Sequence, residues 1–244
     1  MLAIQFLTIL TILPELKVSK RDIQASPCFF PLVGIGLGGL VAGLDWAAKD
    51  VVPSHVLGII ETGWLAFLTR GLHLDGLADT IDGLGGGIEP ERSLEIMRDS
   101  RIGAFGVVAL VLVLLLKSVS LSVVSQRGLW QVMVLVPCFS RLSLVVLGTC
   151  SRYARPSGGL GKAFTGRQIR WTLFVAAPTA LSAGWALMGG IGLLGAVVSG
   201  CIGLLSALYF RRRLGGVTGD VLGAQVEVTE VLMLLLAITH PLLQ

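Results

Sequence analysis

The stretch AFGVVALVLVLLLKSVSLSVV, residues 104–124, decides the fold class of this chain. It has the length of about 20 mostly apolar residues that an α-helix needs to cross the hydrocarbon core of a bilayer. Lys117 is the one charged residue within it. A segment of this kind predicts a transmembrane helix.

The rest of the chain has the same character. Of 244 residues, 54% are hydrophobic and only 14% are charged, and the mean hydropathy is +0.84. A soluble domain carries roughly 25% charged residues. Further apolar runs occupy 29–48, 56–72, 129–149, 171–188, 191–210 and 226–243. The sequence therefore predicts an all-α polytopic membrane protein with about seven transmembrane helices, in a single membrane domain over 1–244.

Two features near the N-terminus refine this expectation. Residues 1–13 are apolar but too short to span comfortably, and Pro14 follows them, so we expect an interfacial or re-entrant helix there. Residues 34–39, GIGLGG, formally match a dinucleotide fingerprint. No strand precedes them, and close helix packing by glycine explains them better. The chain's 32 glycines are also compatible with a homodimer.

Basic residues divide unequally between the two sides that seven spans would create. Fifteen of the 19 lysines and arginines fall on one side, whereas the other side has only Lys49 and Arg127. The segments on the basic side are 14–28, 70–103, 150–170 and 211–225. The positive-inside rule predicts that this side is cytoplasmic. We expect the active-site loops to be 70–103, 150–170 and 211–225.

The segment 70–103 is dense in carboxylates. Asp75, Asp79 and Asp82 are spaced four and then three residues apart, which places all three on one face of a helix. Three carboxylates on one face repel one another unless a cation compensates them. Mg²⁺ binds oxygen ligands, through a few carboxylates and substrate phosphates. We therefore expect magnesium here, with a solvated helix face beside a membrane as the alternative.

Other residues of this segment suggest substrate chemistry. His73 could act as a general base, as a metal ligand or as a hydrogen-bonded interfacial residue. Arg98 and Arg101 flank Asp99. Because guanidinium groups bind phosphate oxygens bidentately, these arginines suggest phosphate recognition. A salt-bridged juxtamembrane segment is the alternative.

The segment 150–170 is basic. Arg152 and Arg155 precede a Gly-Gly-Leu-Gly turn, and Lys162 follows it. The pattern is typical of a polyanion-binding loop, although attraction to lipid headgroups would explain it equally well.

The segment 211–225 combines glycine turns with a carboxylate. Around Thr218 and Gly219, backbone N–H groups can approach an anion, and Asp220 can join a metal. Glu227 and Glu230 follow on the helix that enters the membrane, where unpaired carboxylates are costly. Clustered carboxylates and arginines without a nucleophile motif favour metal-assisted transfer at a diphosphate.

Three motifs together resemble one family. HLDGLADTIDGL (73–84), LEIMRDSRIGAFG (94–106) and GGVTGDVLGA (215–224) are similar to the cobalamin synthase family, the adenosylcobinamide-GDP ribazoletransferases, and the resemblance covers essentially the full chain. It implies a multi-pass Mg²⁺ enzyme of a bacterial or archaeal cell membrane. The implied reaction joins α-ribazole, or its 5′-phosphate, to adenosylcobinamide-GDP and releases GMP late in cobalamin assembly. No nucleic-acid partner is expected.

With this resemblance, the motif positions take expected roles. The expected metal ligands are Asp75, Asp79, Asp82 and Asp220, and the expected catalytic residues are His73 and Asp79. The expected substrate-binding residues are Arg98, Asp99, Arg101, Arg152, Arg155, Lys162, Thr218 and Gly219.

Two other functions remain as alternatives. A CDP-alcohol phosphotransferase motif begins much like residues 75–79, DGLAD, but no arginine follows here and the later spacing differs. An ion-coupled transporter would use intramembrane carboxylates and often has inverted repeats. Here no repeat is evident, and most charged residues lie in loops on one side.

Overall fold

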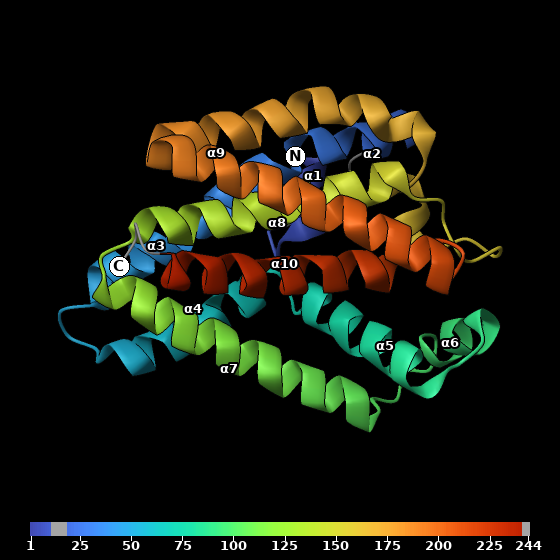
Figure 1. Ribbon diagram of the computed structural model, residues 1–244, viewed down its shortest axis with the longest axis horizontal. Helices are drawn as coiled ribbons and strands as arrows, with labels where there is room; N and C mark the ends of the chain where they lie inside the picture. The colour runs from blue at the N-terminus through green and yellow to red at the C-terminus, as the bar shows by residue number, and fades with distance from the viewer. Residues whose placement is uncertain (11–18, 241–244) are drawn as a thin grey trace.

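The structure is a computed structural model that describes residues 1–10 and 19–240, and these form an almost wholly helical bundle (Figure 1). Within the described chain, strand-like pairing is limited to a parallel bridge between Tyr153 and Val217. This confirms the all-α class. The longer elements are α3 (Phe30–Ala48), α4 (Ser54–Leu68), α5 (Leu72–Gly86), α7 (Ala104–Gln126), α8 (Trp130–Cys150), α9 (Leu173–Arg213) and α10 (Gly219–Thr239). The shorter ones are α1 (Leu2–Leu7), α2 (Lys20–Ala25), α6 (Pro90–Ile96) and the 3₁₀ turns η1 (Ser26–Phe29), η2 (Leu160–Phe164) and η3 (Arg167–Thr172).

Helix α8 lies at the centre of the bundle, in contact with α3, α9 and α10 (Figure 1). Most of its side chains are buried. Two glycines of α3 permit the close contact, because a Cβ at Gly34 or Gly38 would clash with the α8 backbone at Pro137 or Met133. The prediction that the GIGLGG segment packs helices is confirmed.

Helix α9 consists of two arms that fold back on each other at Gly189. This residue has φ 57° and ψ −135°, which is a conformation that glycine adopts at little cost. A Cβ at Gly184 or Gly192 would clash with the backbone of the other, so the arms are in direct contact. The arms correspond to the spans predicted at 171–188 and 191–210.

Five helical segments of the described chain are long and apolar enough to cross a membrane. They are Lys20–Ala48, Ala104–Gln126, Trp130–Cys150, Arg167–Arg213 and Gly219–Thr239. Helix α4 is apolar but has only 15 residues. The expected count of seven is therefore not confirmed, although several apolar helices support the multi-pass membrane class.

The N-terminal helix is shorter than expected. Helix α1 has six residues, against the 13 predicted. It packs on the bundle: the ring centroid of Phe6 lies 4.4 Å from that of Phe164, and the N–H of Ile9 donates to the carbonyl of Leu68 at 2.7 Å. Pro14, and the end of the last predicted span beyond residue 240, lie outside the described residues.

A buried cluster of four charges joins α7, α8 and α10. Lys117 Nζ donates to Glu227 at 2.9 Å and to Glu230 at 2.5 Å. Arg141 also donates to Glu230. Each of these side chains is at most 5% exposed. The two carboxylates expected to be costly in the membrane are thus balanced by two cations on neighbouring helices.

The polar segments meet at one end of the bundle, on the right in Figure 1. The N–H of Ala154 donates to the carbonyl of Val217, and the N–H of Val217 donates to that of Arg152, both at 2.9 Å. The side chain of Arg98 reaches across from the segment after α6 to Ser157, at 2.7 Å. The three expected active-site loops therefore lie together.

Two of these expected loops contain α-helices: one was predicted from the aspartate spacing, and the other corrects the predicted start of the last span. Segment 70–103 contains α5 and α6, and α10 begins at Gly219 rather than near residue 226. The physical reason is capping: the Thr218 hydroxyl accepts the N–H of Val221 at 3.3 Å and so satisfies an otherwise unpaired donor.

Candidate active site

Helix α5 carries the three aspartates that the spacing placed on one face. It begins after a sharp turn at Arg70 and Gly71, which both have positive φ, 54° and 65°. Asp75 is exposed, Asp79 is half-buried and Asp82 is 8% exposed. The expected helical arrangement of the trio is confirmed.

Asp82 has a structural task that the sequence reasoning missed. Its two carboxylate oxygens accept the backbone N–H groups of Gly103, at 2.7 Å, and Gly106, at 2.8 Å. These are donors of the first turn of α7, where negative charge is favoured by the helix dipole. A Cβ at either glycine would clash with the carboxylate. Asp82 therefore joins α5 to the start of α7.

Asp220 faces α5 from the first turn of α10. Its Oδ2 accepts Arg155 Nη2 at 2.7 Å and the hydroxyl of Thr218 at 3.2 Å. A Cβ at Gly76 would lie 2.6 Å from the carbonyl oxygen of Asp220, so only glycine lets α5 and α10 approach this closely. The ion pair and the glycine contact bring three distant segments of the sequence to one place.

The carboxylates are close enough to perturb one another. The pKa of Asp79 is raised to about 6, first by burial and then by the negative charges of Asp220, Asp75 and, less strongly, Asp82. The positive charge of Arg155 opposes this rise. Asp79 is therefore influenced by the charge of each of the other three carboxylates that the sequence selected.

The donor set suits a hard divalent cation in its chemistry. All four side chains offer oxygen ligands, and the pKa of Asp79 is raised by burial and then by neighbouring negative charge that a cation would neutralise. As they stand, no three acidic, histidine or cysteine side chains of the described residues converge closely enough to hold an ion. Ligation would require side-chain rotation.

A cavity of about 270 Å³ adjoins these carboxylates. Asp75, Asp220 and Arg155 form its charged side. Its remaining walls are mostly aromatic, leucine or glycine: Phe6, Phe30, Tyr153, Phe164, Leu72, Leu144, Leu222, Gly76, Gly159, Gly161 and Gly219 are among them. Negative and positive groups beside a flat apolar surface suit a phosphorylated ligand that carries a ring system.

His73 lines the same cavity from its inner side. It is 2% exposed, and neither ring nitrogen has a hydrogen-bond partner in the structure. Burial, with the nearby positive charge of Arg141, lowers its pKa to about 3. His73 is therefore a neutral imidazole with a free acceptor nitrogen, and it is a weak base.

The expected substrate-binding residues separate into three groups. Arg155 and Gly219 line the cavity. Thr218 is buried as the cap of α10. The others surround this end without lining the cavity: Arg98 contacts Ser157, Arg101 pairs with Asp99 at 2.5 Å, Arg152 donates to the Gly215 carbonyl, and Lys162 is exposed.

The Asp99–Arg101 pair is a local surface contact. Hydrogen bonds from the Arg101 side chain and backbone lower the pKa of Asp99 to about 2. Both groups are thus charged and engaged with each other at neutral pH.

Sequence reasoning missed the aromatic walls. Phe6 stacks on Phe30 at 6.2 Å between ring centroids, and both rings contact Phe164. The three come from α1, α3 and η2. No local sequence pattern distinguishes a phenylalanine that lines a cavity from one that packs in an apolar segment. Tyr153, between two arginines of a loop, was the one aromatic residue that the pattern could have indicated.

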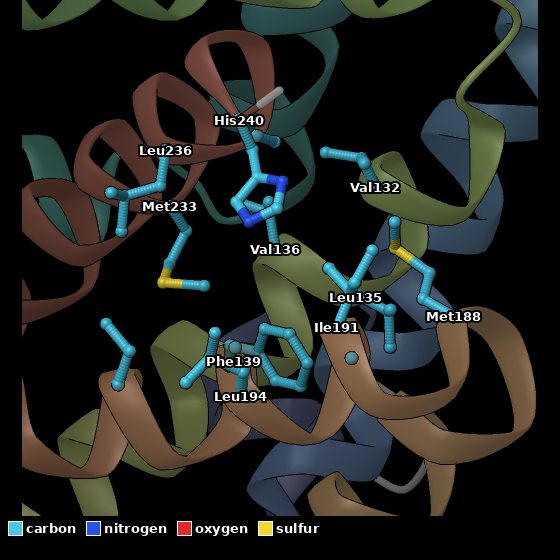
Figure 2. Close-up of a pocket in the computed structure, with 14 residues that line it drawn as sticks. Val132, Leu135, Val136, Phe139, Met188, Ile191, Leu194, Met233, Leu236 and His240 are labelled. Atoms are coloured by element: carbon cyan, nitrogen blue, oxygen red, sulfur yellow. The ribbon is translucent and has the colours of Figure 1, made fainter. Parts of the chain in front are cut away.

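A second cavity, of about 130 Å³, lies between the start of α8, the bend of α9 and the end of α10 (Figure 2). Val136, Phe139, Leu194 and Met233 are among its apolar walls. Of the described residues that line it, none is a carboxylate or an arginine. It lacks the groups that phosphate chemistry needs, so the carboxylate end is the better candidate.

Comparisons with known proteins agree with this choice of chemistry. A family model described as cobalamin-5-phosphate synthase matches residues 1–238. Proteins named adenosylcobinamide-GDP ribazoletransferase are similar along nearly their whole length. That of Syntrophobacter fumaroxidans is 42% identical over 95% of this chain and 94% of the relative, and that of Geotalea daltonii is 41% identical over 96% and 94%. No solved structure matches the chain.

Proposed function

The chain belongs to the cobalamin-5-phosphate synthase family, and we propose that it performs the reaction for which its relatives are named, the transfer of ribazole to adenosylcobinamide-GDP. The arrangement that carries this proposal is the crowding of Asp79 by three other carboxylates beside the Arg155–Asp220 pair and one cavity. The alternative of a CDP-alcohol phosphotransferase is not favoured, because the family model and the relatives described above are named for cobalamin synthesis and ribazole transfer.

The reaction is a substitution at phosphorus. A hydroxyl oxygen of the acceptor forms a bond to the phosphorus that bears cobinamide, the bond to the bridging oxygen of the diphosphate breaks, and GMP leaves with that oxygen. The hydroxyl proton passes to a base. No covalent enzyme intermediate is needed, which agrees with the absence of a nucleophile motif in the sequence.

Asp79 is the base that we favour. A catalytic base works best when its pKa lies near the operating pH. The pKa of Asp79 is raised to about 6, whereas that of His73 is lowered to about 3. His73 then serves as a neutral hydrogen-bonding group at the inner wall of the cavity.

We propose that Mg²⁺ is held beside Asp79 by Asp75, Asp220 and Asp82. When bound, Mg²⁺ would neutralise charge on the diphosphate and on the departing GMP. Arg155 binds phosphate oxygen: its Nε is buried without a partner, while its Nη2 is fixed by Asp220. Arg98 and Arg152 order the surrounding loops through Ser157 and Gly215.

We test this proposal by measuring GMP release from protein in liposomes. The substrates are adenosylcobinamide-GDP and α-ribazole, with Mg²⁺ or with EDTA, and the variants are Asp220→Asn and Asp50→Asn. We expect Mg²⁺-dependent GMP release coupled to cobalamin formation, lost in Asp220→Asn. Asp50→Asn is the matched control, because Asp50 is exposed between α3 and α4 and does not line the cavity. Equal rates in EDTA would exclude the metal proposal.

A further inference from the structure

A second space opens on the other side of Asp75. This groove, of about 710 Å³, lies between α1, α5 and the start of α7, and Leu74, Ala78, Ile102 and Leu110 form its apolar walls. Arg70 is its one cationic side chain among the described lining residues. The groove is distinct from the cavity already described, which contains Arg155 and Asp220.

The two spaces meet at shared residues. Phe6, Leu72 and Asp75 line both. A transfer between two substrates requires that the attacking oxygen and the leaving oxygen reach one phosphorus from roughly opposite sides. Two spaces that adjoin the same proposed metal ligand, Asp75, supply such an arrangement, with one substrate in each.

The side chains that line each space indicate which substrate it binds. The first cavity has Arg155, Asp220 and close glycine backbone, which suit the diphosphate of the activated donor. The groove has aliphatic walls and a single cation. These features suit a nucleoside with an apolar aromatic base and at most one phosphate.

Arg70 has an unusual backbone. It is the one non-glycine residue of the described chain with positive φ, 54°, which is a costly conformation for an arginine. Its Nη2 donates to the carbonyl of Gln5 at 3.2 Å, and the side chain remains exposed at the groove. Strain of this kind persists where the surrounding structure requires it, and it often marks a functional position.

We propose that this groove binds the acceptor, a ribazole-type nucleoside, and that Arg70 binds the 5′-phosphate when the acceptor carries one. The assignment rests on the proposed transferase function. The base packs against Leu74 and Ala78, and a ribose hydroxyl is directed past Asp75 toward the donor. Arg70 is then the residue that sets the preference between ribazole and ribazole 5′-phosphate.

Steady-state kinetics with both acceptors tests this assignment. Arg70→Gln should raise KM for ribazole 5′-phosphate by about 10-fold to 100-fold, because a charge-assisted hydrogen bond is lost. KM for unphosphorylated ribazole and KM for adenosylcobinamide-GDP should change less than about threefold. Arg70→Lys, which keeps the charge, should recover most of the affinity. Leu74→Trp should raise KM for both acceptors and leave that of the donor unchanged.

Arg127→Gln is the matched control. Arg127 is also exposed and also donates to a backbone carbonyl, that of Ile238 at 2.8 Å, but at the other end of the bundle. It should leave all three KM values unchanged. If Arg70→Gln alters KM for the donor alone, or for both acceptors equally, the groove assignment is wrong. If the unmodified protein releases no GMP, the proposed function itself fails, so the two failures are distinguishable.

Discussion

At the scale of single residues, ionised Asp79 is needed for the proposed chemistry but destabilises the folded protein. Its folded-state pKa of about 6 lies above the ordinary value of 3.8. The folded protein therefore binds this proton more tightly than the unfolded chain does. The resulting stabilisation is fully present below about pH 4 and is lost as pH rises through about 6. At neutral pH, ionised Asp79 therefore lowers the free energy of unfolding.

Asp79→Asn should therefore abolish activity while raising thermal stability. We expect GMP release to fall at least about 100-fold, because the general base is lost. In EDTA the melting temperature of the variant should exceed that of the unmodified protein, by more at pH 8 than at pH 5. Thermal scans in detergent check this. A difference that does not grow with pH would show that burial and the charges of Asp220 and Asp75 do not raise the pKa of Asp79.

Individual residues also show what the sequence could reveal of the site. The spacing of Asp75, Asp79 and Asp82 is local information, and a helix converts it directly into a shared face. The pairing of Arg155 with Asp220 crosses 65 positions and depends on the bridge that joins two loops. No local pattern encodes that bridge, so the sequence predicted both residues but not their contact.

At the scale of elements, the contact between α5 and α10 sets the distance between the carboxylates. In Gly76→Ala the new methyl group would need to displace Asp220 of α10. We expect the free energy of unfolding to fall by about 1–3 kcal/mol and GMP release to fall with it. Gly63→Ala is the control, since the corresponding site on α4 is open and the helix should gain up to about 1 kcal/mol. Equal stability of the two variants would contradict the tight contact.

The buried charge cluster holds α7, α8 and α10 together. Glu230→Gln leaves Lys117 and Arg141 with one carboxylate, so an unpaired buried charge remains. We expect a loss of about 3–5 kcal/mol in unfolding measured with detergent denaturation. Glu95→Gln removes an exposed pair with Arg92 and should change stability by less than about 1 kcal/mol. The double change Glu230→Gln with Lys117→Met restores charge balance and should recover part of the loss. No recovery would show that hydrogen-bond geometry matters more than charge.

The sequence predicted those helices that are defined by a long apolar run. Spans at 29–48, 104–124 and 129–149 correspond closely to α3, α7 and α8. The start of α10 was missed because Thr218, Gly219 and Asp220 resemble a loop in hydropathy, although Thr218 is a capping residue. The aspartate spacing predicted a helical face at α5, but its packing against α7 and α10 was not predicted, because no local pattern encodes that contact.

At the scale of the whole molecule, the grouping of loops at one end and the distribution of basic residues predict an orientation. The end that carries the site should face the cytoplasm, because most lysines and arginines between spans lie there. Pro156 is exposed at that end, and Asp50 is exposed in the turn between α3 and α4 on the opposite side. In a background with Cys150 and Cys201 replaced by serine, Pro156→Cys should react with a membrane-impermeant maleimide only in inverted vesicles.

Asp50→Cys should show the reverse pattern, with labelling in intact cells and protection in inverted vesicles. The pair is informative because the two positions share one protein and one expression level, so a uniform difference in access cannot produce opposite results. The nucleotide-activated donor that we propose would then meet the carboxylates from the cytoplasm, while the groove beside Asp75 borders the apolar face of α7. Labelling of Pro156→Cys in intact cells would place the site outside, and the proposed supply of donor from the cytoplasm would have to be abandoned.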